Sequence, residues 1–130
     1  MEQAIFRELK SDFKEIALEP EIWGIMAYGS HVKGDNTIRS DIDVCVVAPK
    51  ANNQTEIIHR IWQVVGGKYD VWLFEELALY LKAEIIQSHE IIYCKDIPAL
   101  FEYFYQFQWQ INDYKQRIRV AEKINKEPNP

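Results

Sequence analysis

The connection between two short apolar runs constrains the fold of this 130-residue chain more than any other feature. Residues 22–28 read IWGIMAY and residues 44–48 read VCVVA. Both runs are short, rich in β-branched or aromatic residues and bounded by turn residues, so each predicts a buried β-strand. The polar residues between them, 29–43, contain two glycines and leave room for one or two helical turns. The pattern therefore predicts a strand, a short helix and a second strand in succession.

Two small motifs lie at the ends of this connection, Gly29-Ser30 and Asp41-x-Asp43. A Gly-Ser turn that follows a strand and opens a helix leaves backbone N–H groups free to hold a phosphate. Aspartates two residues apart on a strand point to the same face. Hard divalent cations prefer such oxygen ligands, and Mg²⁺ typically uses one or two carboxylates together with substrate phosphates. A phosphate cradle beside a metal site predicts a nucleotidyl transferase.

A third apolar run, residues 68–74, contains another acidic residue, Asp70. Its alternation predicts a strand with Tyr69, Val71 and Leu73 on one face and Asp70, Trp72 and Phe74 on the other. A carboxylate inside such a strand is costly to bury unless it is paired or bound to a metal. Asp70 is therefore a third candidate ligand. The alternative is an ordinary turn residue that starts the strand after Gly66-Gly67.

The segment from Tyr28 to Val47, with Asp70 downstream, resembles the DNA polymerase beta-like nucleotidyltransferase superfamily. Within it the chain is most similar to the minimal nucleotidyltransferases, short proteins often encoded beside a HEPN-domain toxin. The resemblance covers residues 22–94. The residues that match the family's motifs are Gly29, Ser30, Gly34, Ser40, Asp41 and Asp43, with Asp70 as the acidic residue of the third strand.

The resemblance also implies roles for these residues. Asp41, Asp43 and Asp70 would be the catalytic residues and the ligands of two Mg²⁺ ions, and they would meet across neighbouring strands. ATP would be the nucleotide substrate. The expected nucleotide-binding residues are Gly29, Ser30, Lys33, Arg39 and Ser40.

The chain departs from the family at the phosphate-binding turn, where His31 and Lys33 stand at positions that many relatives fill with arginine. Lys33 and Arg39 either supply positive charge near a phosphate or are solvated loop cations.

Length and composition limit the number of domains, the kinds of partner and the state of the cysteines. The length fits one domain spanning residues 1–130, with a core of about 22–94. A net charge of −5 and a pI near 5.2 argue against general nucleic-acid binding, which needs a basic surface. The apolar runs are strand-sized, so no membrane partner is expected. Cys45 and Cys94 are expected to be buried free thiols in a cytoplasmic protein.

The rest of the sequence predicts helices around a sheet. Helical stripes cover residues 2–18, 54–65 and 75–87, and a fourth strand covers 90–94. Asn53 is placed to cap the second helix, and Gly66-Gly67 to end it. The fold class is therefore α/β (α+β), a mixed sheet of about four strands with helices packed on it.

A long C-terminal helix is expected over about 98–124. It carries apolar residues at alternating spacings of four and three: Leu100, Phe104, Phe107, Ile111, Tyr114, Ile118 and Ala121. Other aromatic residues lie off this seam. Either the helix packs in its own core and exposes tyrosines, or one face covers the sheet and another binds a partner. That partner is either another protein or a second copy of this chain.

These features predict Mg²⁺-dependent transfer of AMP from ATP to a hydroxyl, with release of pyrophosphate. The chain is too short to hold a separate acceptor-binding domain, so a partner protein is expected to present the hydroxyl. The resemblance implies a tyrosine of a HEPN toxin, which this chain would silence as an antitoxin. Two alternatives stay open: an antitoxin that neutralises by binding alone, and a homodimeric small-molecule nucleotidyltransferase.

Overall fold

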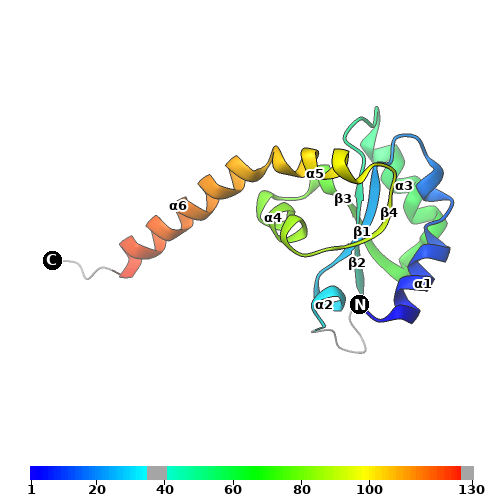
Figure 1. Ribbon diagram of the computed structural model, residues 1–130, viewed down its shortest axis with the longest axis horizontal. Coiled ribbons are helices and arrows are strands. Elements are labelled where there is room, and N and C mark those ends of the chain that lie inside the picture. Colours follow the sequence, from blue (N-terminus) through cyan, green and yellow to red (C-terminus); the bar gives the residue numbers. More distant parts are fainter. Residues whose placement is uncertain (35–40, 127–130) are drawn as a thin grey trace.

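The computed structural model describes residues 1–34 and 41–126, and these residues form a mixed sheet of four strands (Figure 1). The strand order is β3-β2-β1-β4. Strand β1 (Gly24–Tyr28) pairs antiparallel with β2 (Ile42–Val47) and with β4 (Glu90–Cys94), whereas β2 and β3 (Tyr69–Leu73) are parallel. The predicted fold class and all four predicted strands are confirmed, with ends that differ by up to two residues.

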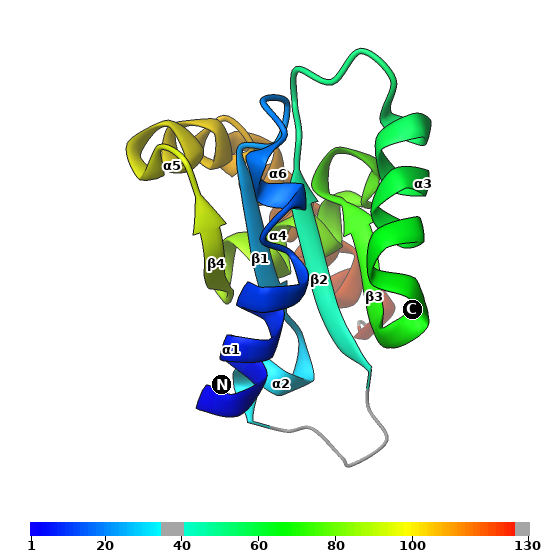
Figure 2. The same cartoon turned by 90° about the vertical axis from the view of Figure 1, so that its right-hand side faces the viewer.

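Helices cover both faces of the sheet. Helices α1 (Gln3–Asp12) and α3 (Gln54–Val65) lie on the face that Figure 2 presents, and α4 (Leu79–Gln87) lies behind it. The core between the first face and its helices includes Leu9, Phe13, Ile25, Val44, Val46, Ile57, Ile61 and Val71. The core on the other face includes Met26, Cys45, Val47, Phe74, Ile85, Leu100 and Phe104. Because β1 and the end of β2 are buried on both faces, their sequences are continuously apolar.

Strand β3 lies at an edge of the sheet and keeps an alternating pattern. Tyr69, Val71 and Leu73 are buried, whereas Asp70 and Trp72 are exposed. The predicted assignment of faces is therefore confirmed for the strand. The Asp70 carboxylate is not buried, because its side of the edge strand is open to solvent.

Both predicted ends of α3 are confirmed. The Asn53 side chain accepts a hydrogen bond from the Glu56 backbone N–H at 3.0 Å, which satisfies one of the free donors of the first turn. Gly66 ends the helix with a φ of +66° and begins the short 3₁₀ turn η2 (Gly66–Lys68) that leads into β3.

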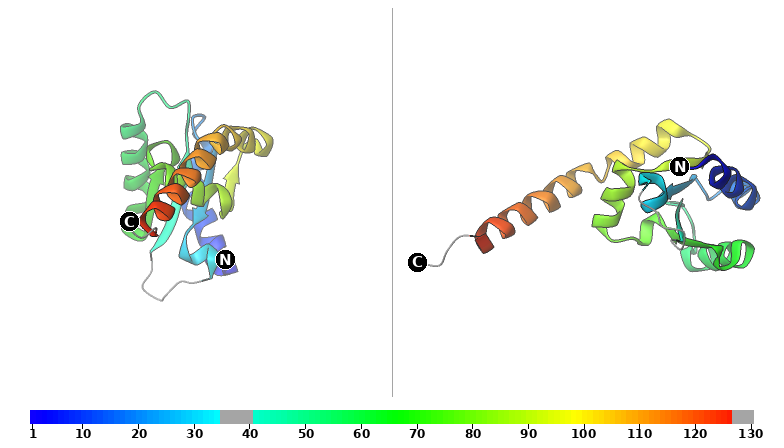
Figure 3. Two further views of the ribbon diagram at one scale, coloured as in Figure 1. Left: turned by 90° about the vertical axis from the view of Figure 1, so that its left-hand side faces the viewer. Right: turned by 90° about the horizontal axis from the view of Figure 1, so that it is seen from below.

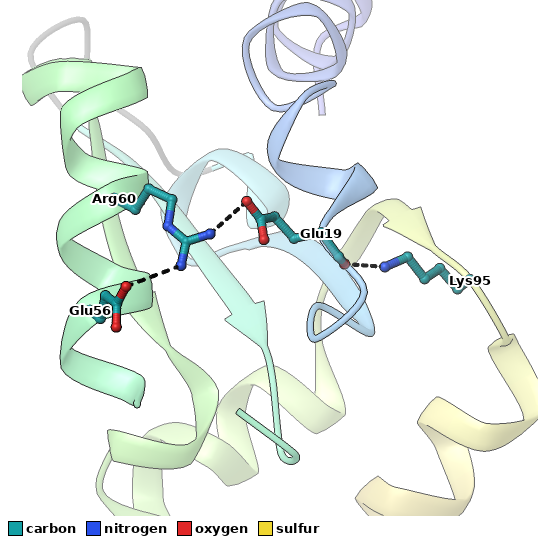
Figure 4. Close-up of polar contacts among 4 residues, drawn as sticks. All are labelled: Glu19, Glu56, Arg60 and Lys95. Atoms are coloured by element: carbon teal, nitrogen blue, oxygen red, sulfur yellow. Dashed lines mark hydrogen bonds and ion pairs between the residues drawn. The ribbon is translucent and has the colours of Figure 1, made fainter. Parts of the chain in front are cut away.

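The first helix is shorter than the predicted 2–18, because the chain turns inward at Phe13. This side chain is fully buried, and its ring lies 5.4 Å from that of Tyr69. The chain continues through the 3₁₀ turn η1 (Ile16–Leu18). Beyond it, Glu19 accepts from Arg60 of α3 at 2.7 Å, and the Glu19 backbone carbonyl accepts from Lys95, as Figure 4 shows.

The third predicted helix, 75–87, begins four residues late. Residues Phe74–Glu76 form the 3₁₀ turn η3 instead. The Glu75 carboxylate accepts hydrogen bonds from the Ala48 backbone N–H at 2.8 Å and from the Tyr103 hydroxyl at 2.9 Å. This tether to the end of β2 holds the turn in place, and α4 starts only at Leu79.

The predicted single C-terminal helix over 98–124 is two helices, α5 (Ile97–Tyr105) and α6 (Gln108–Lys126). At the break, the N–H groups of Gln106 and Phe107 bond carbonyls three residues back, a tighter 3₁₀ geometry. The Phe107 ring packs against Phe74 at 5.5 Å, which favours the break. Helix α6 then projects from the sheet and its helices (Figures 1 and 3). In the described part of the chain, no helix is long and apolar enough to cross a membrane.

Candidate active site

Two of the three predicted aspartates lie side by side at one end of the sheet. Asp43 of β2 and Asp70 of β3 are direct partners across the parallel ladder, so their side chains emerge on the same face. Asp43 is half-buried and Asp70 is exposed. This end of the sheet also holds the turn from β1 into α2 (Ser30–Lys33), at the bottom of Figure 2.

Burial raises the pKa of Asp43 to about 6, and the neighbouring charge of Asp70 adds to this rise. A hydrogen bond between the two carboxyl groups also favours the protonated form of Asp43. His31 of α2 opposes these effects and lowers the pKa of Asp43, whereas Asp41 raises it slightly. A cation bound between the two carboxylates would relieve their mutual repulsion and so favour the ionised form of both.

Gly29 provides the room for this arrangement. It has a φ of +82° and lies next to Tyr28, the partner of Asp43 across the antiparallel ladder. A Cβ atom at position 29 would overlap the Oδ2 atom of Asp43. Glycine is therefore needed here both for its backbone conformation and for the close approach of the turn to the carboxylate.

Asp41 precedes β2, two residues before Asp43, and is exposed. Within residues 1–34 and 41–126 no three acidic, histidine or cysteine side chains form a metal-binding group. Ser30 opens α2 after Gly29, and Lys33 ends the helix. Arg39 and Ser40, the other two predicted nucleotide-binding residues, lie outside the described residues.

Two tryptophans beside Asp70 were not predicted as part of the site. The Trp72 indole N–H donates to Oδ1 of Asp70 at 2.8 Å, and the ring of Trp62 from α3 lies 5.7 Å from that of Trp72 at 88°. The i+2 spacing of Asp70 and Trp72 already places both on one face of a strand. Nothing in the sequence pairs Trp62 with Trp72, because that contact depends on how α3 packs.

The donor set fits a divalent cation. Asp43 and Asp70 present carboxylate oxygens from adjacent strands, and Mg²⁺ in nucleotide sites needs only one or two protein carboxylates in addition to substrate phosphates. The chemistry is therefore expected at the end of the sheet where these two carboxylates meet.

Comparison with known proteins agrees with this geometry. Residues 11–98 match the family described as "Polymerase beta, Nucleotidyltransferase". The chain belongs to this nucleotidyltransferase family. It is also 42% identical over 110 residues to a Methanocaldococcus jannaschii protein named "Putative protein adenylyltransferase", an alignment that covers 80% of this chain and 86% of that protein.

Solved structures show that the polymerase beta-like fold extends over nearly the whole chain. A chain from a toxin–antitoxin structure with AMP-PNP has a TM-score of 0.58 at 13% identity, covering 92% of this chain and 93% of that one. A chain from a complex of tri-AMPylated Shewanella oneidensis HEPN toxin with MNT antitoxin has a TM-score of 0.58 at 16% identity, covering 92% and 97%. At these identities the likeness concerns the fold. The predicted resemblance to the nucleotidyltransferases is confirmed.

Proposed function

We propose that this nucleotidyltransferase moves AMP from ATP to a tyrosine hydroxyl of a partner HEPN toxin and so acts as its antitoxin. The observation that carries the proposal is the pairing of Asp43 with Asp70 beside the Gly29 turn. The relative named as a protein adenylyltransferase supports AMP transfer to protein. The fold neighbours that contain AMP-PNP and an AMPylated HEPN toxin support the nucleotide and the partner.

The carboxylates would bind the metal ions. Asp41 and Asp43 would ligate both Mg²⁺ ions, and Asp70 would complete the site nearest the acceptor. When bound, the two ions supply positive charge that stabilises the attacking and leaving oxygens of an in-line displacement. The raised pKa of Asp43 means that its proton must leave before it can serve as a ligand, so metal binding is expected to weaken below about pH 6.

The remaining residues would hold the two substrates. The Gly29–Ser30 backbone and the Ser30 hydroxyl would bind the terminal phosphates of ATP, with Lys33, Arg39 and Ser40 alongside. The acceptor oxygen attacks the α-phosphorus and forms the new O–P bond. The bond between the α-phosphorus and its bridging oxygen breaks, and pyrophosphate leaves with the electron pair. The exposed Asp70 would accept the proton of the acceptor hydroxyl.

Helix α6 is the surface that we assign to the partner. It projects from the sheet and its helices (Figure 1) and carries exposed apolar side chains, with Trp109 at 76% and Ile124 at 65% exposure. It also carries more basic than acidic residues, although the whole chain has a net charge of −5. An apolar, basic helix of this kind favours an acidic protein groove. We take residues 1–130 as one catalytic unit and place it in the cytoplasm, where ATP is available and Cys45 and Cys94 stay reduced.

The test is incubation of the chain with Mg²⁺ and α-labelled ATP, alone and with the product of the neighbouring gene, followed by intact-mass analysis. We expect AMP units on the tyrosine-containing partner, lost in Asp41→Asn. Asp41 is exposed and lies before β2, so this variant should fold normally. Full transfer by Asp41→Asn would refute the assignment.

The exposed face of α6 also favours a second candidate, neutralisation of the toxin by binding alone. In that case a stable complex forms and silences the toxin without any change in its mass. If the chain is a homodimer and transfers labelled AMP to a small molecule instead of a protein, it is a small-molecule nucleotidyltransferase.

A further inference from the structure

The hydrogen bond between Trp72 and Asp70 ties an aromatic side chain to the candidate site. The indole N–H donates to Oδ1 of Asp70 at 2.8 Å. An indole can only donate, and a carboxylate acceptor makes this bond stronger than one between neutral groups. One oxygen of Asp70 is thus engaged by the protein, which restricts the rotation of the carboxylate and leaves its other oxygen for a neighbour.

Trp72 is itself held in place by α3. The ring of Trp62 meets that of Trp72 nearly at right angles, 5.7 Å away, a preferred geometry for aromatic pairs. The Trp62 indole N–H donates to the backbone carbonyl of Val71 at 3.0 Å. Two indoles therefore fix three consecutive residues of β3, from Asp70 to Trp72.

Core packing does not account for this arrangement. Trp72 is 41% exposed and Trp62 is 37% exposed, and neither belongs to the two buried clusters that stabilise the sheet. Trp72 neighbours Cys45 across the ladder, two pairs along from Asp43 and Asp70 and therefore on the same face. The exposed tryptophan therefore stands beside the candidate site, and its N–H points to a site carboxylate.

We infer that Trp72 is a positioning residue: its indole N–H orients Asp70 so that the other oxygen of this carboxylate, on the side of Asp43, can bind a divalent cation together with Asp43. This inference rests on the proposed function. Groups that hydrogen-bond to metal ligands typically contribute about 10- to 100-fold to metal affinity or activity. Because Asp70 is exposed, we expect the lower end, about tenfold.

The test measures binding of Mn²⁺ alone, by electron paramagnetic resonance of the free ion, at pH 7. Benzothienylalanine at position 72 keeps the shape of tryptophan and replaces the N–H with sulfur. We expect this substitution and Trp72→Phe to weaken Mn²⁺ binding equally, by about tenfold. Tyr80→Phe is the control, because this aromatic side chain lies on α4 and is 57% exposed; it should bind Mn²⁺ like the unaltered chain.

Wild-type Mn²⁺ affinity in the benzothienylalanine protein would overturn the inference, because a merely structural role survives that change. The result does not depend on whether Trp72→Phe folds. Asp43→Asn separates the inference from the proposed function. If Asp43→Asn loses Mn²⁺ binding and the benzothienylalanine protein keeps it, only the inference fails. If the unaltered chain binds no Mn²⁺ and transfers no AMP, both fail.

Discussion

Asp43→Asn is expected to stabilise the fold while it abolishes AMP transfer. The substitution keeps the size of the side chain and removes its charge. In the folded chain, burial and the nearby Asp70 raise the pKa of Asp43 from 3.8 to about 6. The ionised carboxylate therefore destabilises the folded state at neutral pH. Functional sites commonly trade stability for activity in this way.

The size of the gain follows from the pKa. A rise from 3.8 to about 6 corresponds to at most about 3 kcal/mol, at ~1.36 kcal/mol per pKa unit. Asp43 is only half-buried, so solvent screening should reduce this to about 1–2 kcal/mol. For a chain of 130 residues, that gain raises the Tm by about 4–7 °C.

The pH dependence has a defined sign. Between pH 4 and 6 the folded state holds more protons than the unfolded state, so the unfolding free energy falls as pH rises through this window. The destabilisation by the Asp43 charge is complete at pH values above the pKa of Asp43 in the folded state, and it is absent at pH values below its pKa in the unfolded state. The advantage of Asp43→Asn should therefore be full at pH 7 and close to zero at pH 4.

Thermal and denaturant unfolding in the presence of EDTA, at both pH values, measure this difference. Asp41→Asn is the matched control, because Asp41 is exposed and contributes least to the raised pKa of Asp43. It should lose AMP transfer without a gain in stability. A stability gain for Asp43→Asn that is as large at pH 4 as at pH 7, or a loss of stability at pH 7, would refute the electrostatic reasoning.

Two further predictions concern the glycine turn and the C-terminal helix. Gly29→Ala should lower the free energy of unfolding by about 3 kcal/mol in a urea titration and abolish transfer, because φ is +82° and the added Cβ overlaps Asp43. Gly34 also has a positive φ, +80°, but open space surrounds it. Gly34→Ala should therefore lower the free energy of unfolding by only about 1 kcal/mol. If the two variants lose the same free energy of unfolding, the overlap with Asp43 does not explain the need for Gly29. Deleting residues from 113 onward should leave the Tm nearly unchanged, because Ile111 is the last buried residue among the side chains that the structure describes in α6. The same deletion should abolish complex formation with the proposed HEPN toxin in size-exclusion chromatography. A complex of unchanged stability would place the partner elsewhere.

The sequence allowed the strands, and the faces on which their side chains lie, to be predicted for physical reasons that are local. Strands β1 to β3 are short apolar runs between turn residues, and their faces follow from the alternation of side chains. Asp43 and Asp70 occupy the start of two such strands. The ladder brings them together once β2 and β3 pair in parallel.

Features that depend on tertiary packing could not be predicted in this way. The break between α5 and α6 depends on Phe107 packing against Phe74, which comes from a distant turn. The late start of α4 depends on the bond from Tyr103 to Glu75. Trp62 belongs to the apolar stripe of α3, and only the folded chain shows that this residue meets Trp72.

Ile111, in the first turn of α6, separates two sets of evolutionary constraints. Leu100, Phe104 and Ile111 are buried, and a substitution at any of them changes the stability of the domain. Beyond Ile111, side chains such as Ile118 and Ile124 face solvent, and substitutions of exposed residues usually alter stability by less than ~0.5 kcal/mol. Under the proposed function, the outer part of α6 could therefore diverge in step with a changing partner at little cost to the site, so that one catalytic core could be adapted to different toxins.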